Sequence, residues 1–206
     1  DASSSGGIVN IVLKKGVKLG TSGSVNAAYF QGVYSTQTAG FNINKGAGKI
    51  NSYLNYQFTN RNNFESLNSD RYISSDSSLL SQRSYSTYPS MNNYISAGID
   101  YAISKKFSAS YDMRIVLNNG KSYALNPIEI RNFETGVITG RNESDIDNSN
   151  ASTFIGNTLS SKYKIDSAGS EWTSQLEYNY YKNNNDQLYR NSSFLPAGNG
   201  VNGDGE

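Results

Sequence analysis

Hydrophobic and polar residues alternate with a period of two along much of the chain. In Phe107–Asn118, every second position from Phe107 to Leu117 is apolar or aromatic, and the intervening positions are mostly polar. Successive side chains of a β-strand point to opposite faces, so this alternation predicts strands with one apolar face. No segment shows the 3.6-residue period of an amphipathic helix. About seven strands are predicted, at Thr21–Gln31, Thr38–Lys45, Ile50–Thr59, Asn93–Ile103, Phe107–Asn118, Ser152–Ile165 and Trp172–Tyr181.

The connections between these strands alternate between short and long. Residues 45–49, 104–106 and 166–170 are short turns, whereas 60–92, 119–149 and the stretch from 183 to 206 are long, polar and rich in Asn, Ser and Tyr. An antiparallel up-and-down meander with short turns at one end and long loops at the other gives this order. Outer-membrane β-barrels are built in this way, whereas a soluble β-sandwich has Greek-key connections.

Aromatic residues gather near the two ends of the predicted strands. One group lies beside the short turns, and a second lies toward the long connections. Two such bands are typical of the membrane interfaces of a β-barrel, although aromatic residues are also common in strands generally. The first group is Tyr101, Phe107, Tyr163 and Trp172, and the second is Tyr29, Phe58, Tyr94, Tyr178 and Tyr180.

Composition and charge exclude several classes of function. The chain has neither Cys nor His, which excludes a disulfide scaffold, a zinc finger and a Ser-His-Asp triad. The formal net charge of +1 provides no field that would attract nucleic acid, so no nucleic-acid partner is expected. No apolar run is long enough to form a transmembrane helix. Strands that alternate in hydropathy can still cross a membrane as a β-barrel.

Carboxylates are the remaining route to catalysis or metal binding. No two of the glutamates form a recognisable acid–base pair, so we expect no enzymatic activity and no catalytic residue. Asp145–Asn150 places oxygen ligands at alternate positions but lacks the glycine and glutamate that a calcium loop requires, so no metal ion or other cofactor is expected. The glutamates considered are Glu129, Glu134, Glu143, Glu171 and Glu177.

The start of the chain carries the most specific motif. The segment Gly6–Gly16 has two glycines, an aliphatic core interrupted by Asn10, and a basic finish before its last glycine. It resembles the end of the plug domain in TonB-dependent outer-membrane receptors, particularly those of Bacteroidota, although Leu13 stands where Thr is frequent. Within it, the residues Gly6, Gly7, Ile8, Asn10 and Ile11 are expected to be structural and to make no contact with a ligand.

The resemblance implies a fold class and a domain division. The expected fold is all-β: part of an antiparallel up-and-down transmembrane β-barrel, with about seven strands, preceded by the last strand of a plug. Residues 1–18 would end the plug, and 19–206 would begin the barrel, with extracellular loops at about 60–92, 119–149 and 183–206. Receptors of this family close 22 strands around the plug. We therefore expect the chain, which begins at Asp1 without a signal peptide, to be a piece of a longer protein.

The resemblance also implies a function in the cell outer membrane. Such receptors bind a scarce extracellular ligand, which can be a small molecule, a glycan or a peptide, and import it with energy supplied through TonB. The implied partners are the TonB complex, contacted through a part N-terminal to this chain, the lipid of the outer membrane and a surface lipoprotein. Two alternatives stay open: a soluble secreted β-rich binding or adhesion module, and a barrel that serves secretion or assembly. The identity of the ligand and its contact residues are not readable from the sequence.

Overall fold

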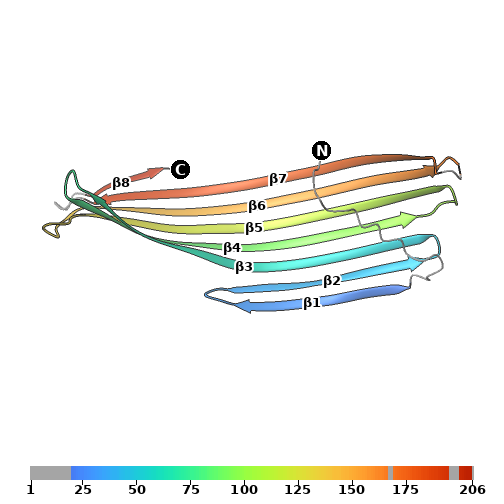
Figure 1. The fold of residues 1–206 in the computed structure, drawn as a ribbon, viewed down its shortest axis with the longest axis horizontal. Helices are drawn as coiled ribbons and strands as arrows, with labels where there is room; N and C mark the ends of the chain where they lie inside the picture. Colours follow the sequence, from blue (N-terminus) through green and yellow to red (C-terminus); the bar gives the residue numbers. More distant parts are fainter. Residues whose placement is uncertain (1–19, 167–168, 195–199, 206) are drawn as a thin grey trace.

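The computed structural model describes residues 20–166 and 169–194, and the backbone of 200–205. These residues form one antiparallel sheet of eight strands in which each strand lies beside its neighbours in sequence (Figure 1). The predicted up-and-down order is therefore confirmed. The strands are β1 (Thr21–Gln31), β2 (Ser35–Ala47), β3 (Ile50–Ile73), β4 (Ser78–Tyr101), β5 (Phe107–Asn132), β6 (Ile138–Lys164), β7 (Glu171–Phe194) and β8 (Gly200–Gly205).

The predicted short turns are confirmed, but the prediction of long loops is wrong. Residues 60–92 and 119–149 continue the strands of two tall hairpins, which close through turns at 74–77 and 133–137. Residues 183–194 continue β7 in the same way. In these segments both faces of the strands are polar, so the contrast that reveals a strand in the sequence is lost. Backbone pairing needs no such contrast, because its hydrogen bonds join main-chain groups.

The register between strands is regular over nearly the whole sheet. β3 pairs with β4 without a shift from Ile50 opposite Tyr101 to Ile73 opposite Ser78. Between β5 and β6 the register shifts only between Ile130 and Arg131, near the end of that hairpin. Because a shift of one residue would move a side chain to the other face, the regular register keeps each face continuous from strand to strand.

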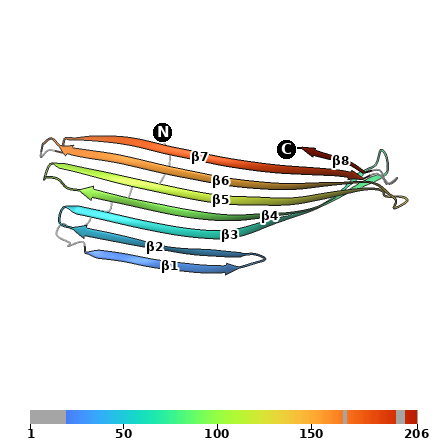
Figure 2. The same ribbon diagram turned by 180° about the vertical axis from the view of Figure 1, so that it is seen from behind.

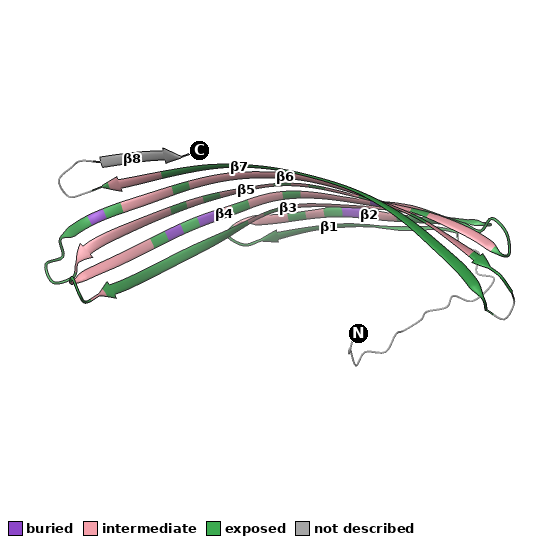
Figure 3. Cartoon of the chain, turned by 90° about the horizontal axis from the view of Figure 1, so that it is seen from above, coloured by how far each residue is buried: buried purple, intermediate pink, exposed green. Residues whose placement is uncertain are grey.

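Among the described residues, the sheet is a single curved layer with no second layer against either face (Figures 2 and 3). No hydrophobic residue among those described is buried. The described residues also contain no helix that is long and apolar enough to cross a membrane. The strand order is linear from β1 to β8, so the sheet is open. The expected end of the plug, residues 1–18 with Gly6, Gly7, Ile8, Asn10 and Ile11, lies outside the described residues.

Candidate functional site: an exposed apolar band and a polar face

The register brings the apolar faces of successive strands onto one face of the sheet. Leu54 of β3 lies opposite Ala97 of β4, which lies opposite Met113 of β5. Together these positions form a surface that we call the apolar band. Its members are Ile50, Ser52, Leu54, Tyr56 and Phe58 of β3, Ile95, Ala97, Ile99 and Tyr101 of β4, Phe107, Ala109, Tyr111, Met113, Ile115 and Leu117 of β5, Ile155, Asn157, Leu159, Ser161 and Tyr163 of β6, and Trp172, Ser174, Leu176, Tyr178 and Tyr180 of β7.

The apolar band contains no charged residue, and its large side chains are either half-buried or exposed. Leu159 is 51% exposed, and Trp172 and Leu176 are each 68% exposed. From Ile50 to Phe58 the band runs about 27 Å along β3, at about 3.4 Å per residue. A strand that crosses a bilayer needs about nine to eleven residues, so the length of the band fits a hydrocarbon layer.

Aromatic side chains border the apolar band at its short-turn end. Tyr163 lies opposite both Phe107 and Trp172, which places three aromatic residues side by side on adjacent strands. Toward the other end, Phe58 and Tyr180 belong to the same face. Tyr94 is at a similar height but lies opposite Gln57 and Val116, on the other face of the sheet. It therefore belongs to neither aromatic row, although the sequence placed it near one.

The opposite face, which we call the polar face, carries the charged residues of the same strand segments. Every residue that the structure describes as buried also lies on this face. Such burial is the pattern expected for the inner side of a curved sheet, where side chains crowd one another. The charged residues are Asp100, Asp112, Arg114, Lys162 and Glu177, and the buried residues are Gly40, Ser84, Ser86, Ser96, Gly140 and Gly156.

A glycine lets two polar side chains meet across an intervening strand. Tyr53 of β3, Gly98 of β4 and Asp112 of β5 lie in one row of the polar face. The hydroxyl of Tyr53 donates a hydrogen bond of 2.6 Å to Oδ1 of Asp112. A Cβ atom at Gly98 would overlap the ring of Tyr53 and the carboxylate of Asp112. Only glycine at this position leaves room for the bond.

A second row repeats this arrangement with different side chains, and a third glycine lies beside a cation–π contact. Asn26 Nδ2 donates to Gln57 Oε1 at 3.4 Å across Gly40, which lies between them in the row. Gly156 lies opposite Arg114, whose guanidinium is 5.1 Å from the ring centroid of the neighbouring Phe154, a cation–π contact. On the polar face, Asp112 and Arg114 thus each have a partner within the sheet.

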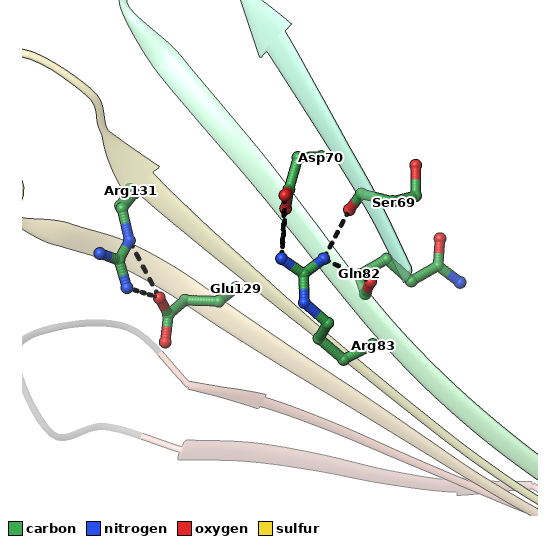
Figure 4. A network of polar contacts seen from close by, with 6 residues as sticks. All are labelled: Ser69, Asp70, Gln82, Arg83, Glu129 and Arg131. Atoms are coloured by element: carbon green, nitrogen blue, oxygen red, sulfur yellow. Dashed lines mark hydrogen bonds and ion pairs between the residues drawn. The ribbon is translucent and has the colours of Figure 1, made fainter. Parts of the chain in front are cut away.

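Beyond the apolar band, the same face becomes charged. Arg83 forms an ion pair with Asp70 at 2.8 Å, and its guanidinium also donates to the carbonyl oxygens of Ser69 and Gln82. Arg131 pairs with Glu129 nearby (Figure 4). Hydrogen bonds from Ser81 and then Arg83 lower the pKa of Asp70 below its ordinary value of 3.8. Charges of both signs mark this region as one that water covers.

The hairpin of β1 and β2 is shorter than the next hairpin and is anchored to it by aromatic side chains. Tyr34, in the turn at its end, meets the ring of Phe64 at 6.0 Å, and Phe64 stacks on Tyr85 at 5.9 Å. The hydroxyls of Tyr34 and Tyr85 are hydrogen-bonded at 3.0 Å, which raises the pKa of Tyr85. On the other face, Tyr88 donates to Glu65 at 3.2 Å. These contacts fix the height at which the short hairpin ends.

The structure disperses the carboxylates that the sequence offered for catalysis. Glu129 and Glu143 pair with arginines two residues away on their own strands, and Glu171 pairs with Lys162 at 2.7 Å. Glu134 accepts a bond from Ser77, and Glu177 accepts one from Gln175. Asp145–Asn150 lies within β6, so its alternate oxygens belong to a strand and do not surround a common point.

Comparison with protein-family models and with curated proteins found no match for this chain. The glycine rows and the ion pairs of the tall hairpins escaped the sequence reasoning because both depend on the register between strands. Gly98 and Gly156 inside predicted strands were the available signal, since an isolated strand glycine often marks a close approach.

Proposed function

We propose that the chain forms part of the wall of an outer-membrane β-barrel, within a TonB-dependent receptor that binds and imports a scarce extracellular ligand. The observation that carries the barrel is the inverted distribution of side chains. Large apolar residues such as Leu159 and Leu176 are exposed, whereas the buried residues lie on the polar face. A domain folded in water buries its apolar face. If lipid covers the apolar band and water covers the polar face, each face meets the solvent that suits its side chains, and the distribution is no longer inverted.

Each face then has a defined task in the barrel. The apolar band contacts lipid, and its aromatic rows lie at the two interfaces. The polar face lines the hydrated interior, where the charges of Asp112 and Arg114 meet hydrogen-bond and cation–π partners. The charged ends of the tall hairpins stand beyond the outer interface and contribute extracellular surface. No catalytic step is involved, and ligand moves when TonB acts on the plug.

The open edges of the sheet support the same proposal. Within the part of the chain that the structure describes, β1 pairs with β2 alone, and β8 pairs with β7 only between Tyr189 and Phe194. Unpaired backbone groups are costly in lipid, where no water can bind them. Further strands of a complete barrel would pair both edges. The link to TonB rests on the resemblance of Gly6–Gly16 to the end of a plug domain.

The experiment is made on the outer-membrane fraction of the native source, with an antibody against this sequence. The fraction is run on gels with and without boiling, after cross-linking in intact cells. We expect a band several times larger than this chain that shifts on heating, as a stable barrel does, and that cross-links to TonB. A heat-shifted band without the TonB product would leave a barrel for secretion or assembly. A soluble species unmoved by heating would contradict the membrane proposal and favour a secreted binding module.

A further inference from the structure

The part of β3 near its turn with β4 has one unpaired edge, because β2 is shorter than β3. β2 pairs with β3 only as far as Thr36, which lies opposite Arg61. Beyond that point β3 continues to Ile73 and is paired only with β4 on its other side (Figure 1). Among the described residues, β3 contacts no element other than β2 and β4. We call the unpaired side of Asn62–Ile73 the free edge.

The free edge offers main-chain hydrogen bonds to a partner strand. In an antiparallel sheet, every second residue directs both its N–H and its C=O group to one side. The segment contains no proline, and its register with β4 has no shift. Proteins block such an edge with charged side chains, proline, a bulge or a covering element. Among the described residues, the free edge carries charges but has no proline, bulge or covering element.

An open notch of about 700 Å³ lies where the free edge begins. The end of the short hairpin, including Gly32 and Tyr34, lines one side of the notch. Asn63, Phe64 and Tyr88 of the tall hairpin line the other side. The contacts of Tyr34 with Phe64 and Tyr85 anchor the end of the short hairpin to the tall hairpin. The notch is therefore a fixed step in the sheet, with an aromatic lining and an exposed strand edge.

Charges along the free edge define the chemistry of a partner. Glu65 and Arg71 are exposed on the polar face of β3, six residues apart. Glu65 accepts a hydrogen bond from Tyr88. Among the described residues, neither Glu65 nor Arg71 is in an ion pair. An antiparallel partner would therefore place an acidic residue opposite Arg71 and a basic residue opposite Glu65. An apolar residue would follow, opposite Phe64.

We propose that the free edge of β3 binds an extended peptide as an added antiparallel strand, with an acidic residue, a basic residue six positions later and an apolar residue directly after it. Main-chain bonds supply affinity in this mode, and side chains supply selectivity. A second copy is the other candidate occupant. Edge-to-edge antiparallel pairing would invert one copy along the strand direction. The two apolar bands would then lie at opposite ends of the paired segments, which one membrane does not allow. This last step rests on the proposed function.

The test uses the purified protein in detergent and an eleven-residue fluorescent peptide. The peptide has Glu at position 3, Lys at position 9, Val at position 10, and Thr or Val at the other positions. Position 3 then lies opposite Arg71, and position 9 lies opposite Glu65. One control peptide exchanges Glu and Lys without changing the composition. A second control is methylated on alternate backbone nitrogens, in each of the two possible phases. We expect the charge exchange to weaken binding about tenfold, and one methylation phase to abolish it.

A protein variant reverses the charge preference. In the variant with Glu65→Lys and Arg71→Glu, the exchanged peptide should bind about tenfold more tightly than the original. Hydrogen exchange should show new protection in Asn62–Ile73 and none in β1, which serves as an internal control. The methylation result on the unchanged protein keeps the proposal falsifiable even if the variant does not fold.

Several results would overturn the proposal. They are no binding of the peptide, equal binding of both methylated forms, protection confined to another edge, or a dimer that protects Asn62–Ile73 without peptide. The proposed transport function is tested by the heat-shifted band and the TonB cross-link, which the charge-exchanged variant should retain. Peptide binding and transport can therefore fail separately.

Discussion

The two halves of the long strands have the same backbone pairing but different distributions of side chains. In the half near the short turns, one face is the uncharged apolar band and the other carries Asp112, Arg114 and Glu177. In the half that forms the tall hairpins, both faces are polar, and the face that continues the band carries ion pairs such as Arg83–Asp70. The register of β3 with β4 is unbroken through both halves.

This difference shows that strand pairing and side-chain distribution have separate causes. Main-chain hydrogen bonds hold the sheet together along its whole length. The side chains are matched to what surrounds each half, which we propose to be lipid on one face near the short turns and water elsewhere. Predictions that exchange the chemistry of the two faces, or of the two halves, therefore test the comparison.

The largest effect is expected when a charge is moved onto the middle of the apolar band. Leu159→Arg should destabilise the membrane-inserted form by about 2–4 kcal/mol, the cost of an arginine against lipid at mid-depth. The matched control is Thr158→Arg on the adjacent position, which lies opposite Asp112 and Glu177 on the polar face. It should leave the folded fraction nearly unchanged. The measurement is the fraction of heat-shifted protein after refolding into lipid vesicles, and equal losses in the two variants would contradict the two-faced arrangement.

A smaller effect is expected when the glycine row of the polar face is closed. Gly98→Ala should cost about 1–3 kcal/mol in unfolding by urea from vesicles, because the added Cβ displaces Tyr53 from the partly buried Asp112. Gly120→Ala is the control, since its Cβ would meet only the carbonyl oxygen of Pro89, at 4.0 Å. In a Tyr53→Ala background, Gly98→Ala should cost much less, because only the Asp112 carboxylate then remains close to the added Cβ. A full cost there would show that the loss does not come from the Tyr53 contact.

The smallest effect is expected from the exposed charges of the tall hairpins. The pKa of Asp70 is lower in the folded protein than its ordinary value of 3.8. Its ionised form therefore stabilises the hairpin at neutral pH, and this contribution is lost as the pH falls below 3.8 and through the lowered pKa. The protection of the β3–β4 turn against hydrogen exchange, relative to the intrinsic rate at each pH, should fall in acid, and Asp70→Asn should remove this pH dependence. An unchanged acid response in the variant would assign the effect to other carboxylates.

The features predicted from the sequence depend on the contrast between the apolar and polar faces of a single strand. The features that were missed depend on contacts between adjacent strands. Period-two alternation located Phe107–Asn118 and the other strands of the short-turn half, because their two faces meet different surroundings. It failed at residues 60–63, Asn-Arg-Asn-Asn, where β3 continues with polar residues on both faces. The Tyr53–Asp112 bond and the free edge of β3 were out of reach because both require the register and the relative lengths of adjacent strands.

The most direct test of the two-faced wall is a cysteine scan of β6, which is straightforward because the chain has no native cysteine. Single cysteines are placed from Phe154 to Ser161 in the protein inserted into vesicles. Each is labelled with a fluorophore and probed with a quencher in the lipid chains and with a quencher in water. We expect lipid quenching at 155, 157, 159 and 161 and water quenching at 154, 156, 158 and 160. Equal quenching by water at both sets of positions would contradict the proposal that the apolar band faces lipid.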